Sequence, residues 1–213
     1  PELCLQLDQQ ISCHGANNGS IQATTTLSGS LTFDIDGANA FSNTTGFFNG
    51  LTPGTHTVCV TNGSTTGCST ITLIDPPALN FTFNIDSVAG CAGQMGGLSA
   101  NITGGTLILL TSPLTEWRNS SNVLLNPNTG FDENYHNYVG GIPGGTYTLR
   151  VEDEMFCNLT KTVVLPELCL QEDQQISCHG AHDGTVQAST TTAGTWNFGI
   201  DGSPMTNPSG LFL

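Results

Sequence analysis

LTFDID, residues 31–36, alternates apolar and polar side chains without interruption. Successive side chains of a β-strand point to opposite faces, so Leu31, Phe33 and Ile35 share one face and their polar neighbours share the other. The same alternation returns late in the chain, with Trp196, Phe198 and Ile200 on one face. Alternation of this kind is typical of an antiparallel sheet that covers a core with one face. It predicts a β-sandwich.

Composition extends this prediction along the whole chain. Thr-rich runs such as residues 24–26 and 190–192 favour strands. Gly or Pro recurs about every eight to twelve residues, as short strands joined by turns require. In the first part of the chain we predict strands at residues 3–7, 19–25, 31–36, 46–48, 55–61 and 69–74. The fold class is therefore all-β, built from small Ig-like sandwiches.

The chain repeats itself. PELCLQLDQQISCHGA, residues 1–16, returns at residues 166–181 with only Leu7 exchanged for Glu172. A middle copy is marked by LTPGTHTV, residues 51–58, which returns as IPGGTYTL, residues 142–149. We therefore expect tandem Ig-like repeats at 1–76 and 77–165 and an incomplete third at 166–213, which matches the first as far as about Asn49. Proline at short junctions stiffens the joints, which predicts a rod.

Charge and cysteine usage restrict the partners. The chain has three basic and seventeen acidic residues, which gives it a formal charge of −14. Such a charge repels phosphate backbones and anionic lipid surfaces. We therefore expect no nucleic-acid partner, and no apolar run is long enough for membrane insertion. Eight cysteines without any C-x-x-C pair indicate disulfides made in an oxidising compartment, so we expect an extracellular protein.

The middle repeat suggests how the cysteines pair. It keeps Cys91 and Cys157 as counterparts of Cys13 and Cys68, but has Asn80 in place of Cys4 and Arg150 in place of Cys59. Two cysteines lost together are most simply partners. This predicts three bridges and leaves Cys169 and Cys178 to partners beyond Leu213; the bridges are Cys4–Cys59, Cys13–Cys68 and Cys91–Cys157.

Motifs for catalysis and cofactors are missing from the sequence. It contains no G-x-S-x-G, H-E-x-x-H or P-loop, and His14 and His179 follow cysteines expected to be oxidised. We expect no enzyme, no cofactor and no metal centre. Asp34 and Asp36 are expected to be solvated turn acids, with weak calcium binding as the less favoured alternative. One aromatic cluster is a candidate carbohydrate-binding surface, although core or turn-packing roles are favoured for its members: Trp117, Phe131, Tyr135 and Tyr138.

Taken together, these motifs resemble the SprB-type repeat of gliding-motility surface adhesins in Bacteroidetes. The resemblance rests on CHGANNGSI (13–21) followed by LTPGTHTV (51–58) and Cys68, and on their counterparts in the other copies. It implies a cell-surface filament, exported by type IX secretion and associated with the outer membrane, that grips polysaccharide or a substratum. It also implies O-glycosylation at Ser87, since Asp86-Ser87-Val88 is similar to the acceptor signal of that group.

Two other functions fit the same residues. The chain could be a protomer of a polymerised pilus or sheath, in which a strand from another chain completes the third repeat. It could instead be a carbohydrate-binding module. A pilin stiffened by isopeptide bonds is disfavoured, because Lys161 is the only lysine.

Overall fold

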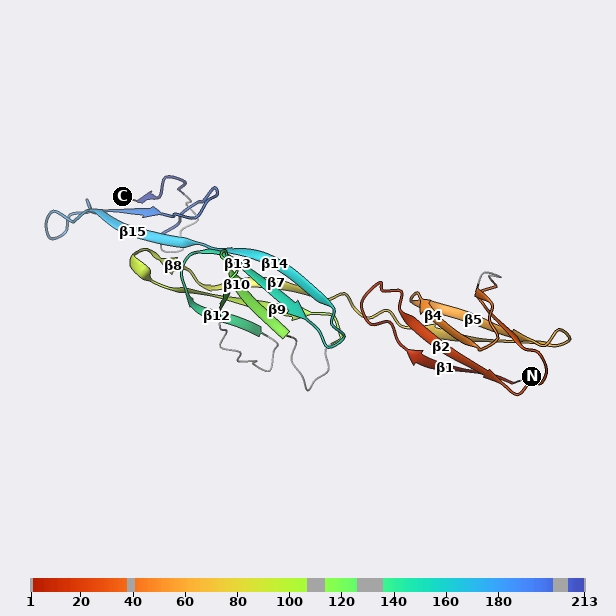
Figure 1. Cartoon of the computed structure of the whole chain (residues 1–213). Coiled ribbons are helices and arrows are strands. Elements are labelled where there is room, and N and C mark those ends of the chain that lie inside the picture. Colours follow the sequence, from red (N-terminus) through yellow and green to blue (C-terminus); the bar gives the residue numbers. More distant parts are fainter. Residues whose placement is uncertain (1, 38–40, 107–113, 126–135, 201–206, 213) are drawn as a thin grey trace. The chain divides into compact units, whose positions relative to one another are not determined.

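A computed structural model describes residues 2–37, 41–106, 114–125, 136–200 and 207–212 (Figure 1). The first repeat has six strands, close to those predicted from its alternation. They are β1 (Leu3–Gln9), β2 (Gly19–Thr25), β3 (Thr32–Ile35), β4 (Phe47–Leu51), β5 (Gly54–Thr61) and β6 (Thr66–Leu73). The all-β prediction is confirmed.

These six strands form two sheets, β1-β2-β4 and β3-β5-β6. Inward side chains of both sheets share one core, in which Ile21, Phe33, Val58 and Leu73 are all less than 5% exposed. Named A, B, C, E, F and G in chain order, the strands give one ABE sheet and one CFG sheet, which is the immunoglobulin arrangement. The repeat is an Ig-like sandwich.

The second repeat copies this order. One sheet holds β7 (Asn80–Ser87), β9 (Gly96–Thr103) and β12 (His136–Ile142); the other holds β10 (Leu114–Asn119), β11 (Leu124–Leu125), β13 (Gly145–Glu152) and β14 (Asn158–Leu165). Trp117 of β10 is fully buried, and its ring centroid lies 5.7 Å from that of Phe83 on β7. A buried tryptophan on the third main strand is a hallmark of Ig-like sandwiches.

Residues 166–212 reproduce one sheet of the first repeat. β15 (Glu167–Gln174) pairs with β16 (Thr185–Ser189), and β16 pairs with β17 (Leu211–Phe212), in the order of β1, β2 and β4. The register agrees residue by residue: Cys169 faces Ser189 as Cys4 faces Thr24. Both strand pairs even shift register at the same place, after Leu7 and after Glu172. The sequence repeat is therefore also a structural repeat.

The chain divides into two compact units. Counting described residues, the first holds 2–37, 41–80, 103–106 and 152–158, and the second holds 81–102, 114–125, 136–151, 159–200 and 207–212. This division follows spatial packing, whereas the predicted boundaries at 76 and 165 follow sequence similarity. Within the described ranges, no helix has the length and apolar character needed to cross a membrane.

Candidate functional site: bridges between repeats

Three disulfides connect six of the eight cysteines, and two of them join segments of different repeats. The bridges are Cys13–Cys157, Cys59–Cys68 and Cys91–Cys169, with Cα–Cα distances of 5.7, 4.1 and 4.9 Å. Cys4 and Cys178 are free and exposed. The prediction that the cysteines form disulfides is confirmed for five of the six named residues, but each predicted pairing is wrong.

Cys4 and Cys59 cannot bond because they point away from each other. On β1, Leu3 and Leu5 pack against the core and Cys4, between them, is exposed. On β5, Val58 and Val60 are buried and Cys59 points outward from the opposite sheet. Cys59 instead lies directly across from Cys68 of β6, on the same outer face, which places the two sulfurs within bonding reach.

Cys13 and Cys68 lie at opposite ends of the first sandwich. The loop that carries Cys13 is held near the end of β6, where Gly15 N donates to Asp75 Oδ1 (2.8 Å) and His14 Nδ1 lies 2.9 Å from Asp75 Oδ2. Cys68 stands five residues before Leu73, the last residue of β6. At roughly 3.3 Å per residue this is about 17 Å, far beyond the span of a disulfide. Cys13 bonds Cys157 instead, and Cys157 Sγ lies 3.3 Å from Ser12 O.

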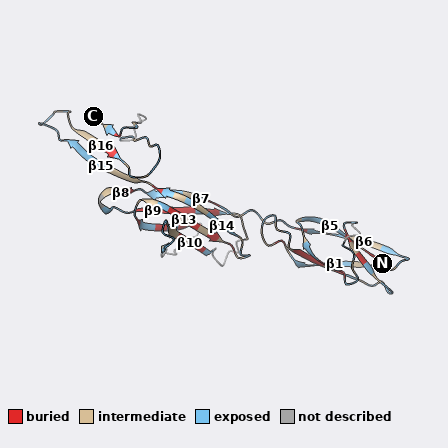
Figure 2. Ribbon diagram, turned by 45° about the horizontal axis from the view of Figure 1, so that its top comes forward, coloured by how far each residue is buried: buried red, intermediate tan, exposed pale blue. Residues whose placement is uncertain are grey.

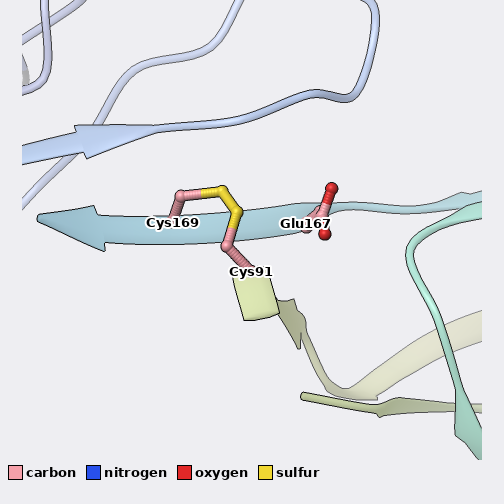
Figure 3. A group of neighbouring side chains, drawn as sticks. All are labelled: Cys91, Glu167 and Cys169. Atoms are coloured by element: carbon pink, nitrogen blue, oxygen red, sulfur yellow. A yellow bond between two sulfur atoms is a disulfide. The ribbon is translucent and has the colours of Figure 1, made fainter. Parts of the chain in front are cut away.

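The bridge of Cys91 was also predicted wrongly, since its partner is Cys169 rather than Cys157. β8 (Ala89–Gly90) runs parallel to the start of β15, with Ala89 facing Glu167 and Gly90 facing Leu168. Continued by one residue, this register sets Cys91 of the η2 turn (Cys91–Gly93) beside Cys169. Figure 3 shows the two sulfurs bonded along β15. The prediction that Cys169 has its partner beyond Leu213 is corrected by the same bridge.

Glu167 makes this bridge resemble a metal cluster, because one ligand atom each from Cys91, Glu167 and Cys169 lies within 4.8 Å of the others (Figure 3). A metal ion binds thiolates, and the two sulfurs are joined to each other. The Glu167 carboxylate already accepts a hydrogen bond from Thr191 Oγ1. These three residues could hold a metal ion only after reduction of the disulfide.

Near the start of β5 and of β13, a buried ring side chain makes a hydrogen bond to a backbone carbonyl oxygen of the preceding turn. Tyr147 Oη donates to Pro143 O (2.5 Å), and burial raises the pKa of Tyr147. This is the arrangement of the tyrosine corner in Ig-like domains. In the first repeat His56 takes the same place, with Nε2 2.9 Å from Thr52 O.

His56 adds an ion pair that sequence reasoning missed. Its Nδ1 lies 2.7 Å from Asp36 Oδ2, while Asp36 Oδ1 accepts from Thr57 N (2.8 Å). Burial acts to lower the pKa of His56, but the hydrogen bonds to Thr52 and Asp36 outweigh it and the pKa is raised. Burial likewise acts to raise the pKa of Asp36, and the hydrogen bonds from His56 and Thr57 bring it below its usual value. Asp36, predicted to be a solvated turn acid, is thus engaged through both oxygens.

The predicted aromatic cluster does not form a surface platform in the described part of the chain. Trp117 is fully buried, as a core residue, while Tyr138 is 43% exposed. Phe131 and Tyr135 lie outside the described residues.

Ser87 is exposed at the end of β7. The preceding residue, Asp86, links two strands, because its Oδ1 accepts a hydrogen bond from Ser99 Oγ (2.8 Å). The first repeat has the same contact, in which Asp8 Oδ2 accepts from Ser20 Oγ (2.6 Å). The aspartate of the acceptor signal is therefore a general feature of the repeat, whereas the serine is particular to the second copy.

The third repeat presents an apolar groove on the face that is covered in the first repeat. Leu170 is 69% exposed and Ile200 42% exposed, whereas Ile35, the counterpart of Ile200, is 3% exposed. Figure 2 shows β15 largely in the exposed colour. The groove is lined by Leu168, Leu170, Val186, Ala188, Phe198 and Phe212 among others.

No protein-family model and no curated protein matches the chain. Solved structures with Ig-like tandems do. A chimeric titin Z1Z2-Z1Z2 tandem is 18% identical, over 78% of this chain and 99% of its own, with a TM-score of 0.33. The N-terminal eight Ig domains of Down Syndrome Cell Adhesion Molecule are 13% identical to this chain. The match covers 94% of this chain and 30% of that one, with a TM-score of 0.45.

Domains 4 and 5 of the S-layer protein SbsC are 18% identical, over 78% of this chain and 96% of theirs, with a TM-score of 0.36. The chain thus spans less than a third of the eight-domain chain of the cell adhesion molecule and nearly all of the other two chains. At such TM-scores these likenesses carry no argument about function. The Ig-like assignment rests on the strand order and the buried corner residues.

Proposed function

We propose that the chain is a non-enzymatic segment of a large cell-surface adhesin filament, in which the repeats form a disulfide-joined stalk. The observation that carries the proposal is that two of the three bridges, Cys13–Cys157 and Cys91–Cys169, cross from one repeat into the next. Bridges confined to single repeats would stabilise each sandwich but leave the junctions held by backbone alone.

A stalk must transmit force through its junctions. Interfaces between domains of one chain are usually small and polar, so the default for an unbridged junction is relative motion. A covalent bridge across the junction limits how far the two repeats can separate when their packing is lost. The free energy of such bridges also favours folding, by about 2–4 kcal/mol each in typical proteins.

Surface properties support an extracellular place for this stalk. Disulfides persist in oxidising compartments, and the charge of −14 keeps neighbouring chains apart in solution. On the resemblance to SprB-type repeats, we propose further that the filament is exported by type IX secretion, serves gliding motility and attachment, and contacts polysaccharide or a substratum. Exposed Ser87 would be its O-glycosylation site.

Attachment is tested with beads coated with the full chain and placed under flow on bare glass and on polysaccharide-coated glass. We expect retention at shear stresses that remove beads coated with an unrelated acidic protein. A retention curve equal to that of the acidic control on every surface would contradict the adhesin role, and substrate turnover by the chain would contradict the non-enzymatic one.

A second candidate is a protomer of a pilus or sheath, in which chains would associate through the apolar groove of the third repeat. In the first repeat the matching face is covered by β5 and β6, which contribute Val58, Val60 and Leu73 to the core. In a polymer, a strand from another chain would cover this groove, whereas in the stalk a later part of the same chain would cover it. Multimers that survive a reductant and dissociate in denaturant would support this candidate over the stalk.

A further inference from the structure

Three side chains that can ligate a metal meet at the Cys91–Cys169 bridge. The two sulfurs and one carboxylate oxygen of Glu167 lie within 4.8 Å of one another (Figure 3). Among the described residues, no other three His, Cys, Asp or Glu side chains meet this limit. Thiolates and carboxylates are ligands that Zn²⁺ takes in proteins. In the disulfide form the two sulfurs are bonded to each other, so the set becomes available in the reduced chain.

The Cys59–Cys68 bridge shows that a carboxylate on a neighbouring strand is not sufficient for such a set. Cys59 lies across from Asp34 in the β3–β5 pair and across from Cys68 in the β5–β6 pair. These three side chains nevertheless do not form a group within the 4.8 Å limit. The chain thus contains a matched control, a second cysteine pair whose nearest strand neighbour is acidic but out of range.

Glu167 is held in place by several contacts. Its Oε2 accepts a hydrogen bond from Thr191 Oγ1, and its backbone N donates to Thr192 Oγ1 (3.0 Å). It also lies against Gly144, where a Cβ atom would come within 2.8 Å of Glu167 Cβ. A larger residue at Gly144 would therefore displace Glu167. A ligand that is oriented by an outer hydrogen bond is the usual arrangement around protein metals.

The strands place the two cysteines at a separation that suits either a disulfide or a metal. The parallel pairing of β8 with β15 brings Cys91 beside Cys169, with a Cα–Cα distance of 4.9 Å. A disulfide holds its sulfurs about 2 Å apart, whereas tetrahedral zinc holds two thiolate sulfurs about 3.8 Å apart. Side-chain rotation supplies this difference, so the strand pairing does not have to change.

We propose that the Cys91–Cys169 bridge is a redox-dependent zinc site. In the reduced chain Cys91 Sγ, Cys169 Sγ and the Glu167 carboxylate bind one Zn²⁺ ion. Water fills the fourth position of the tetrahedron, since all three residues are only partly buried. The metal then holds β8 beside β15 in place of the disulfide. This inference concerns the chemistry of one bridge and does not depend on the adhesin role.

A small thiol such as glutathione opens the bridge. One glutathione thiolate attacks a sulfur of the bridge and forms a mixed disulfide, and a second glutathione thiolate attacks that mixed disulfide and releases the protein thiol. The bridge gains two electrons and two protons, and two glutathione molecules become one oxidised molecule. Zn²⁺ then replaces the two thiol protons, which are released to the solvent.

The test measures how Zn²⁺ protects each cysteine of the full wild-type chain from alkylation. The chain is reduced with a phosphine, the reductant is removed under argon, and iodoacetamide is added over a series of buffered Zn²⁺ concentrations. Mass spectrometry gives the alkylation rate of each cysteine, because only a free thiolate reacts rapidly. We expect Cys91 and Cys169 to reach half-protection at a Zn²⁺ concentration at least about tenfold lower than Cys59 and Cys68 do.

Two matched variants test the carboxylate ligand. Glu167→Gln removes the charge at the proposed site and keeps the size of the side chain, and Asp34→Asn does the same beside the control pair. In Glu167→Gln the Zn²⁺ concentration for half-protection of Cys91 and Cys169 should rise at least about tenfold. In Asp34→Asn it should equal that of the wild-type chain.

Far-ultraviolet circular dichroism of the reduced chain, with and without Zn²⁺, reports whether the strands persist. Loss of the strand signal that Zn²⁺ does not restore would overturn the proposal. Equal protection of the two cysteine pairs would also overturn it, as would a Glu167→Gln variant that is protected as well as wild type.

Discussion

Removal of the Cys13–Cys157 bridge should nearly double the length to which the chain can be pulled. With this bridge closed, a pulling force passes from the first residue to Cys13, crosses to Cys157 and continues to the last residue. This path has roughly 68 residue steps, which at about 3.6 Å each gives a maximal length of about 250 Å. In the C13S/C157S variant the path crosses the two other bridges and takes about 125 steps, or about 460 Å.

Single-molecule force spectroscopy on chains held by terminal tags measures these lengths. A fully reduced chain should reach about 760 Å, since all of its 213 residues then bear the force. The matched control is C91S/C169S, which removes the other bridge between repeats. It should leave the length at about 250 Å, because that bridge lies off the shortest path while Cys13–Cys157 is closed.

The rival pairing gives a different number. If each repeat were bridged internally as Cys4–Cys59, Cys13–Cys68 and Cys91–Cys157, the shortest path would take about 91 steps, or about 340 Å. A wild-type length near 340 Å, or a C13S/C157S variant no longer than wild type, would refute the reasoning.

Three other predictions address the core, the ion pair and calcium. Trp117→Ala should lower the free energy of unfolding by about 3–5 kcal/mol, because it leaves a cavity at a fully buried site. The control is Tyr138→Ala, at a partly exposed aromatic residue, and an equal shift of the urea midpoint in both variants would contradict the prediction. Because the pKa of His56 is raised, its contribution to stability is complete below pH ~6.5 and is lost as pH rises through the folded pKa. Because the pKa of Asp36 is lowered, its contribution to stability is present above pH ~3.9 and is lost as pH falls through the folded pKa. The free energy of unfolding should therefore fall on both sides of pH ~4–6.5 relative to a His56→Tyr variant, and parallel profiles for the two proteins would disprove the link. A chelator should leave the thermal midpoint unchanged, because Asp36 is engaged by His56 and Thr57, and a large drop would show a calcium site at Asp34 and Asp36.

The strands could be predicted from sequence because their signal is local. Alternation of Phe33 and Ile35 with polar residues placed a strand within one residue of β3 at each end. The repeated phrase at residue 166 predicted a third copy of the repeat, and the structure gives its β15–β16 pair the same register as β1–β2. Both signals depend only on neighbouring side chains and on similarity within the chain. The Ig-like order then follows from six short strands and one shared core.

The bridges could not be predicted in the same way. Cys4 and Cys169 stand in nearly identical sequences, yet Cys4 is free and Cys169 is bonded, because only β15 has β8 beside it. A partner supplied by another repeat leaves no mark in the sequence around the cysteine. The His56–Asp36 pair was missed for a related reason, since its residues lie twenty apart and meet only once β3 and β5 are adjacent.

Disulfide mapping of the oxidised full chain tests the central claim most directly, that bridges join successive repeats. Free thiols are alkylated first, the chain is digested without reductant, and linked peptides are identified by mass spectrometry. We predict Cys13 linked to Cys157, Cys59 to Cys68 and Cys91 to Cys169, with alkylated Cys4 and Cys178. Recovery of Cys13 linked to Cys68 and of Cys91 linked to Cys157 would confine every bridge to one repeat and contradict the account.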